Sequence, residues 1–169
     1  KYSVNAERIY ATGMSNGGFF SFHLACNLDA SFAAIASVTG SMSYETFNNC
    51  KARKPTPVMQ IHGSIDSVVP YAGINSVMKP VMEIMEFWKT NNSCDDFVLA
   101  VPGILPGTTS WKETYLFDNC LNGTQNIHLF VQGAGHIWPG SKYHRINEPD
   151  SSQRIWNFFS KYDINGVIQ

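Results

Sequence analysis

Short apolar runs alternate along the chain with segments that have the periodicity of a helix. Four runs predict buried strands, namely residues 8–13, 32–40, 57–63 and 127–133. Between positions 80 and 90, apolar residues recur at the i, i+3, i+4, i+7 spacing of one helix face: Val81, Ile84, Met85 and Trp88. Further helices are expected over residues 17–29 and 153–162, the latter capped by Ser151 or Ser152. This alternation predicts an α/β protein with a mainly parallel sheet.

Two β-rich runs, residues 97–101 and 111–117, flank a Pro- and Gly-rich segment at 102–109. We expect them to form an antiparallel excursion from the sheet. No repeat or low-complexity tract interrupts the pattern, and a chain of 169 residues has the size of one domain. Residues 1–169 are therefore predicted to form a single domain.

The composition argues against two classes of partner. The net charge is −1 and the basic residues are scattered, so neither a nucleic-acid groove nor a polybasic membrane patch is expected. No apolar run approaches the roughly 18 residues of a membrane span. The first residue is Lys rather than Met, and we expect the chain to be part of a longer translated product.

Four cysteines are present at wide spacing, Cys26, Cys50, Cys94 and Cys120. None forms a C-x-x-C pair, so neither a zinc nor a redox site is expected, and no metal or cofactor is predicted. An even count fits two disulfides in a secreted protein. Four buried thiols in a cytosolic enzyme are the alternative.

The strongest chemical signal is a G-x-S-x-G match at residues 13–17, between a predicted strand and a predicted helix. Such a turn is so tight that its central residue is strained, and small residues on either side let the backbone pass closely. Ser15 would then stand at a helix N-terminus, where negative charge is favoured. Ser15 is predicted to be a nucleophile, with the N–H of Asn16 as an oxyanion donor. The alternative is a structural Gly-rich turn.

A serine nucleophile needs a base and an orienting acid, which follow it in the order acid, then histidine, in this class of sheet. His136 is the best base, because it follows the strand at 127–133 in a loop with Gly133 and Gly135. The other histidines lie within predicted elements, lack turn framing or break the chain order: His23, His62, His128 and His144.

Asp66 is the best acid, because it follows the buried strand at 57–63 at the carboxyl edge of the sheet. It would hold the imidazole tautomer and stabilise the imidazolium. The rival carboxylates follow no core strand in this way: Asp95, Asp96, Asp118, Asp150 and Asp163.

Three motifs carry a resemblance over nearly the whole chain: RIYATGMSNGGFFSFHLAC, PVMQIHGSIDSVVPYAG and GAGHIWPG. In this order they resemble the poly(3-hydroxybutyrate) depolymerase and feruloyl esterase family of secreted α/β-hydrolases. The resemblance implies the α/β-hydrolase fold, with Ser15 as nucleophile, Asp66 as acid and His136 as base.

The resemblance also implies disulfides Cys94–Cys120 and Cys26–Cys50, and secretion. The chain departs from the family at its N-terminal part, because the strands and the oxyanion loop that precede the nucleophile strand are missing from it. We therefore expect the nucleophile strand at residues 8–12 to have an open edge. An upstream segment or a second copy of the chain would fill that edge and supply a second oxyanion donor.

The machinery implies hydrolysis of a carboxylic ester, of feruloyl, polyhydroxyalkanoate or short-chain type. Trp138, just beyond His136, is a candidate aromatic wall for the substrate, and packing of its own loop is the alternative. Trp111 and Tyr71 are weaker candidates. Two other functions stay open, a non-catalytic or weakly active fragment and a serine peptidase or acyltransferase with the same three residues.

Overall fold

The computed structural model describes residues 2–28, 31–95, 98–100, 113–141 and 150–168. Its centre is a six-stranded sheet with the strand order β1-β2-β3-β6-β5-β4. The first four of these strands are parallel, β5 is antiparallel to its neighbours β6 and β4, and β4 therefore has the same direction as the first four. The bounds are β1 Tyr10–Met14, β2 Ala34–Val38, β3 Val58–Gly63, β6 Asn126–Val131, β5 Glu113–Phe117 and β4 Val98–Ala100. The predicted α/β fold with a mainly parallel sheet is confirmed.

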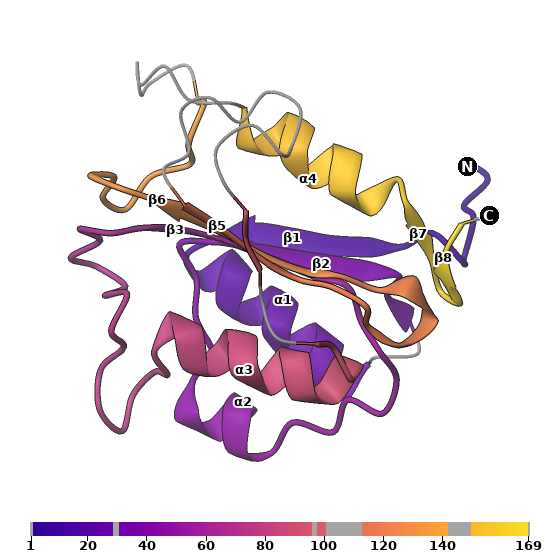
Figure 1. The fold of residues 1–169 in the computed structure, drawn as a ribbon, viewed down its shortest axis with the longest axis horizontal. Coiled ribbons are helices and arrows are strands. Elements are labelled where there is room, and N and C mark those ends of the chain that lie inside the picture. Colours follow the sequence, from indigo (N-terminus) through magenta and orange to yellow (C-terminus); the bar gives the residue numbers. More distant parts are fainter. Residues whose placement is uncertain (1, 29–30, 96–97, 101–112, 142–149, 169) are drawn as a thin grey trace.

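Helices cover both faces of the sheet (Figure 1). One face carries α1 (Asn16–Asn27), α2 (Tyr44–Asn48) and α3 (Val81–Asn92), and the other carries α4 (Ser151–Phe159). The short helix α2 was not expected from the sequence. Neither were the 3-10 turn η2 (Leu121–Gly123) and the small hairpin of β7 (Tyr162–Asp163) and β8 (Gly166–Val167).

The last helix lies nearer the N-terminus than the predicted range 153–162. It begins at Ser151, and Asp150 caps it by accepting the N–H of Ser152, so the prediction of Ser151 or Ser152 as the cap was wrong. It ends at Phe159, and Tyr162 begins β7 instead of extending the helix. Tyr162 is fully buried, and its carbonyl oxygen accepts a hydrogen bond from the hydroxyl of Tyr10 at 2.7 Å. Burial of this ring, the hydrogen bond from Tyr10 and the pairing of β7 with β8 outweigh the continuation of the helix.

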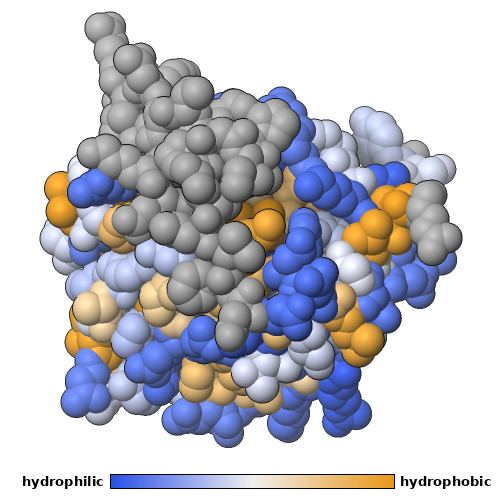
Figure 2. All heavy atoms as spheres, viewed as in Figure 1, coloured by the Kyte–Doolittle hydropathy of each residue, from blue (hydrophilic) through white to orange (hydrophobic). Residues whose placement is uncertain are grey.

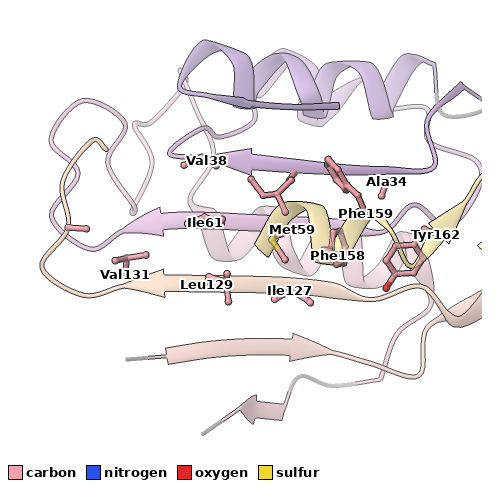
Figure 3. Packing of buried hydrophobic residues seen from close by; sticks show 13 residues of the cluster. Ala34, Val38, Met59, Ile61, Ile127, Leu129, Val131, Phe158, Phe159 and Tyr162 are labelled. Atoms are coloured by element: carbon pink, nitrogen blue, oxygen red, sulfur yellow. The ribbon is translucent and has the colours of Figure 1, made fainter. Parts of the chain in front are cut away.

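The core beneath α4 explains why small residues occupy β2. Phe158, Phe159 and Tyr162 pack against Ala34 and the neighbouring aliphatic residues of the sheet (Figure 3). Alanine side chains leave room there for the aromatic rings, and Phe159 also stacks on Tyr10 with 4.8 Å between ring centroids. On the opposite face, a second cluster joins α1 and α3 to the sheet around the buried rings of Phe22 and Trp88.

Two disulfides tie the helices to loops, and the structure leaves no free cysteine among the described residues. Cys26 of α1 bonds Cys50, which follows α2, and Cys94, which follows α3, bonds Cys120. Both pairings that the resemblance implied are confirmed. The bonds close segments with sequence separations of 24 and 26 residues.

Within the described part of the chain, β1 is an edge strand, with β2 as its partner. Apolar side chains lie exposed on the helices beside it, Phe20 on α1, Leu28 just after α1 and Trp156 on α4. Elsewhere, hydrophilic and hydrophobic residues are interspersed over the face drawn in Figure 2. Of the helices in the described segments, none has the length and apolar character needed to cross a membrane.

Candidate active site

The turn between β1 and α1 holds Ser15 in a strained conformation. Ser15 has φ 55° and ψ −121°, a region that costs a non-Gly residue about 1–3 kcal/mol. Its N–H donates to the carbonyl of Val38 at 2.9 Å, and its own carbonyl accepts from the N–H groups of Gly18 and Phe19. These bonds fix the backbone of Ser15 between the end of β2 and the first turn of α1.

Close backbone approach explains the first glycine of the motif. A Cβ atom on Gly13 would lie 2.7 Å from the Cα atom of Gly17. By contrast, a Cβ atom on Gly17 would meet no atom within 4 Å. The steric demand of the G-x-S-x-G turn therefore falls on Gly13.

Asn16 is the first residue of α1 and is exposed. The first N–H groups of a helix have no intrahelical acceptor and lie at its positive end. The N–H of Asn16 therefore stands beside Ser15 where a developing negative charge would be favoured.

Asp66 lies in a tight turn just after β3 and is 5% exposed. Its Oδ1 atom accepts hydrogen bonds from the N–H groups of Val68 and Val69, each at 2.9 Å. Its Oδ2 atom lies 2.8 Å from Nδ1 of His136. Both carboxylate oxygens are thus engaged, and the turn aims one of them at the imidazole.

The loop after β6 carries His136 across the end of β3. The carbonyl of Ala134 accepts the N–H of Ile65 at 3.0 Å, and the hydroxyl of Ser64 accepts the N–H of Gly133 at 2.8 Å. Gly63 makes this approach possible, because a Cβ atom there would collide with carbonyl oxygens of this loop. The side chain of His136 is 18% exposed.

Burial and hydrogen bonding act in opposite directions on Asp66. Burial alone would raise the pKa of the Asp66 carboxyl, but hydrogen bonds from Val69, His136 and Val68 outweigh it, and the pKa lies below its ordinary value. Asp66 is therefore a carboxylate at neutral pH and can hold a proton on Nδ1 of His136.

The three predicted catalytic residues follow neighbouring parallel strands at the same edge of the sheet. Ser15 follows β1, Asp66 follows β3 and His136 follows β6. The structure joins Asp66 to His136 directly. Among the hydrogen bonds of the described residues, none connects Ser15 Oγ to His136, so these two side chains are not hydrogen-bonded in this conformation.

Trp138 lies against the N-terminal end of α4. Its indole N–H donates to the hydroxyl of Ser152 at 3.2 Å. Its ring lines a pocket of about 310 Å³ together with Thr12 of β1 and Trp156 of α4. Trp138 therefore both packs its loop and faces a small apolar hollow beside the nucleophile strand. Tyr71 is half-buried, with its hydroxyl 2.9 Å from Nε2 of His128, and Trp111 lies outside the described residues.

The rival acids and bases have other partners. Asp150 caps α4, and Asp95, Asp118 and Asp163 each accept a hydrogen bond from an Asn or Gln residue. His23 is exposed on α1 and stacks on Phe20. His144 and Asp96 lie outside the described residues.

The sequence did not predict that His62 lies beside Asp66. His62 is fully buried, and its Nε2 atom lies 3.6 Å from Oδ2 of Asp66. Chain order excluded it as the base, but its spacing of four residues from Asp66 was a signal that the two side chains could meet. Within the described segments, no group of three or more His, Cys, Asp or Glu residues is arranged to hold a metal ion.

Comparison with known proteins shows the family of this chain. The model of the phospholipase/carboxylesterase family matches residues 1–96, more than half of the chain. The chain belongs to this family. The match covers the Ser15 turn and the Asp66 turn, whereas His136 lies beyond it.

Curated relatives of this carboxylesterase-family chain include proteins named as acetylxylan and feruloyl esterases. It is 25% identical over 171 residues to the bifunctional acetylxylan esterase/xylanase XynS20E of Neocallimastix patriciarum, covering 99% of this chain and 22% of that protein. It is 28% identical over 146 residues to feruloyl esterase B of Piromyces equi, covering 80% of this chain and 26% of that protein. The chain spans half or less of the length of these relatives.

A solved structure shows the same fold. The acetyl xylan esterase from Aspergillus awamori superimposes with a TM-score of 0.58 at 16% identity, covering 92% of this chain and 60% of that chain. At this identity the likeness concerns the fold.

Proposed function

We propose that this protein is a serine hydrolase of carboxylic esters that works through an acyl-enzyme. The observation that carries the proposal is the Asp66–His136 hydrogen bond at the same sheet edge as the strained Ser15 turn. Membership of the carboxylesterase family supports it.

In the proposed reaction, Ser15 Oγ attacks the ester carbonyl and passes its proton to Nε2 of His136. Asp66 keeps the other imidazole proton on Nδ1 and stabilises the imidazolium that forms. The N–H of Asn16 donates to the oxyanion of the tetrahedral intermediate. The alcohol leaves with the proton from His136, and water then attacks the acyl group on Ser15 with His136 as base.

Formation of the Ser15–His136 contact requires a movement of the His136 loop or of the Ser15 side chain. Catalytic hydrogen bonds are often long without substrate and tighten in the complex. The turn backbone is held on both sides of Ser15, so the adjustment belongs to the side chains and to the loop after β6.

For the substrate, we propose an ester of feruloyl, polyhydroxyalkanoate or short-chain type, with Trp138 as one wall of the acyl or alcohol site. The names of the relatives support this range, since they include feruloyl esterases, an acetylxylan esterase and a poly(3-hydroxyoctanoate) depolymerase. The two disulfides support an extracellular or periplasmic location, because such bonds persist in oxidising compartments.

A substrate panel tests the proposal. Hydrolysis of p-nitrophenyl acetate, methyl ferulate, polyhydroxybutyrate film and a peptide is compared between the wild type and Ser15→Ala. We expect ester cleavage that Ser15→Ala removes, with no peptide cleavage. Peptide cleavage, or ester cleavage that survives in Ser15→Ala, would contradict the assignment.

We also propose that another strand pairs with β1 in the active protein and brings a second oxyanion donor. The edge position of β1 and the exposed Phe20, Leu28 and Trp156 beside it support this, because open apolar edges favour association. We expect the 169-residue chain alone to self-associate in sedimentation experiments or to hydrolyse esters slowly. A stable monomer of these residues with ordinary esterase rates would refute the pairing.

A further inference from the structure

His62 occupies the interior directly behind the Asp66 turn. It is the penultimate residue of β3, its side chain is fully buried, and it lies four residues before Asp66. Its Nε2 atom is 2.8 Å from the carbonyl oxygen of Val69 and 3.6 Å from Oδ2 of Asp66. Val69 is thereby held by both of its backbone polar groups: its carbonyl lies against His62, and its N–H donates to Asp66 Oδ1.

Gln60 determines which ring nitrogen of His62 carries the proton. The side-chain nitrogen of Gln60 lies 2.9 Å from the carbonyl oxygen of Gly40 and 2.9 Å from Nδ1 of His62. A carbonyl oxygen only accepts, so the Gln60 amide must present its NH₂ group there, and the second N–H points at Nδ1. Nδ1 of His62 is then an acceptor, and its proton lies on Nε2, where Val69 accepts it.

A neutral imidazole at His62 agrees with these hydrogen bonds. Burial lowers the pKa of His62 below its ordinary value, against smaller opposing effects of the hydrogen bond to Val69 and of Asp66. A neutral His62 does not compete with His136 for the negative charge of Asp66. Its Nε2 atom, whose proton is donated to Val69, also lies 3.6 Å from Oδ2 of Asp66.

We propose that His62 is a positioning residue for the catalytic acid: through the Nε2–H···O=C bond to Val69 it holds the Asp66 turn so that Oδ2 faces His136. The inference rests on the proposed function for its effect on rate. Its structural content, that the His62–Val69 bond maintains the Asp66–His136 bond, stands apart from catalysis. The carbonyl of Val38 accepts the N–H of Ser15, and Gly40, which lies two residues further on, accepts a hydrogen bond from Gln60. The hydrogen bonds of Gln60 and His62 therefore also connect the Asp66 turn with the segment that holds Ser15.

Two amide substitutions separate the roles of the two ring nitrogens. In His62→Gln the amide nitrogen can take the place of Nε2 and donate to Val69. In His62→Asn the shorter side chain reaches the Nδ1 position and leaves the carbonyl of Val69 without its donor. Both variants replace the imidazole ring by one neutral amide in the same site. A difference between them therefore does not come from the loss of the ring or from the polarity of the new group.

The experiment measures kcat and KM on p-nitrophenyl acetate, and the NMR signal of the His136 Nδ1 proton, for wild type, His62→Gln and His62→Asn of the 169-residue chain. We expect His62→Asn to lose about 10–100-fold in kcat with KM within about twofold, the loss typical of a misplaced catalytic group. His62→Gln should stay within about threefold. The Nδ1 proton signal should persist in wild type and His62→Gln, and broaden through solvent exchange in His62→Asn.

Equal kcat values in the two variants, or a persistent Nδ1 signal in His62→Asn, would overturn the inference. If the wild type hydrolyses no ester, the proposed function fails, whereas the NMR comparison still decides the role of His62. Thermal melts of both variants establish that each is folded, and if His62→Asn does not fold, His62→Ala takes its place in the same comparison.

Discussion

Asp66→Asn is the substitution whose effect follows most directly from the hydrogen bonds of the site. In the wild type, Oδ1 accepts two backbone N–H groups and Oδ2 faces Nδ1 of His136. An asparagine keeps its oxygen toward Val68 and Val69, because the opposite orientation would set an NH₂ group against two N–H donors. The amide nitrogen must then face His136, where the wild type has an acceptor.

The consequence is a change of imidazole tautomer. Because Nδ1 of His136 then faces the N–H donor of the amide, it must accept a hydrogen bond and cannot carry a proton. The imidazole proton therefore moves to Nε2. An Nε2–H group cannot take the proton of Ser15, and the loss typical of this change in serine hydrolases is about 10⁴-fold in kcat. That factor corresponds to about 5 kcal/mol of transition-state stabilisation. The fold should be retained, because both backbone bonds of the turn persist.

Initial rates of p-nitrophenyl acetate hydrolysis at pH 7, with a circular-dichroism melt of each variant, test this reasoning. Asp163→Asn is the matched control, because Asp163 accepts a backbone N–H in a similar turn, from Asn165, outside the site. The control should keep wild-type rates. An Asp66→Asn variant that is folded and within tenfold of the wild type would refute the assignment of Asp66.

Three further predictions concern stability. Gly13→Ala should lower the free energy of unfolding in urea by about 1–3 kcal/mol, because its Cβ would lie 2.7 Å from Gly17, whereas Gly17→Ala should leave it unchanged, because its Cβ would meet no atom within 4 Å. Equal effects of the two substitutions would contradict the steric account. Removing Cys94–Cys120 by a double Cys→Ala change should cost about 3 kcal/mol for its closed segment, and an unchanged melting temperature would argue against the bond. Burial lowers the pKa of His128 to about 3, so the folded state binds fewer protons than the unfolded state between pH 6.5 and 3, and stability falls as the pH drops through this window. From pH 7 to pH 5 the wild type should lose about 2 kcal/mol more than His128→Gln, and parallel curves for the two would contradict this.

The sequence predicted those parts of the fold and site whose signals are local. The position of Ser15 in a tight turn between a strand and a helix follows from the small residues around it. The positions of Asp66 and His136 at the sheet edge follow from the buried strand that precedes each. The hydrogen bond between them, and the missing bond to Ser15, depend on how loops from β3 and β6 meet, which no local pattern encodes.

Other features were missed because their signals are short or depend on tertiary contacts. The helix α2 lies in a segment for which the sequence predicted no element, although Ser43 caps it by accepting the N–H of Thr46. The β7–β8 hairpin has an Asn165-Gly166 turn signal, which the helical pattern before it obscured. The role of His62 could not be inferred, because it depends on Gln60 and Val69 meeting the ring in the folded core.

The central claim is that Ser15 is a nucleophile activated by His136 and Asp66. Reaction of the protein with a fluorophosphonate, followed by peptide mass spectrometry, tests it most directly, because the reagent bonds only to an activated serine. We predict one phosphonylated residue, Ser15, with labelling slowed by orders of magnitude in Asp66→Asn and absent in Ser15→Ala. Labelling of a different residue, or an unlabelled Ser15 under conditions that label a known serine esterase, would contradict the account.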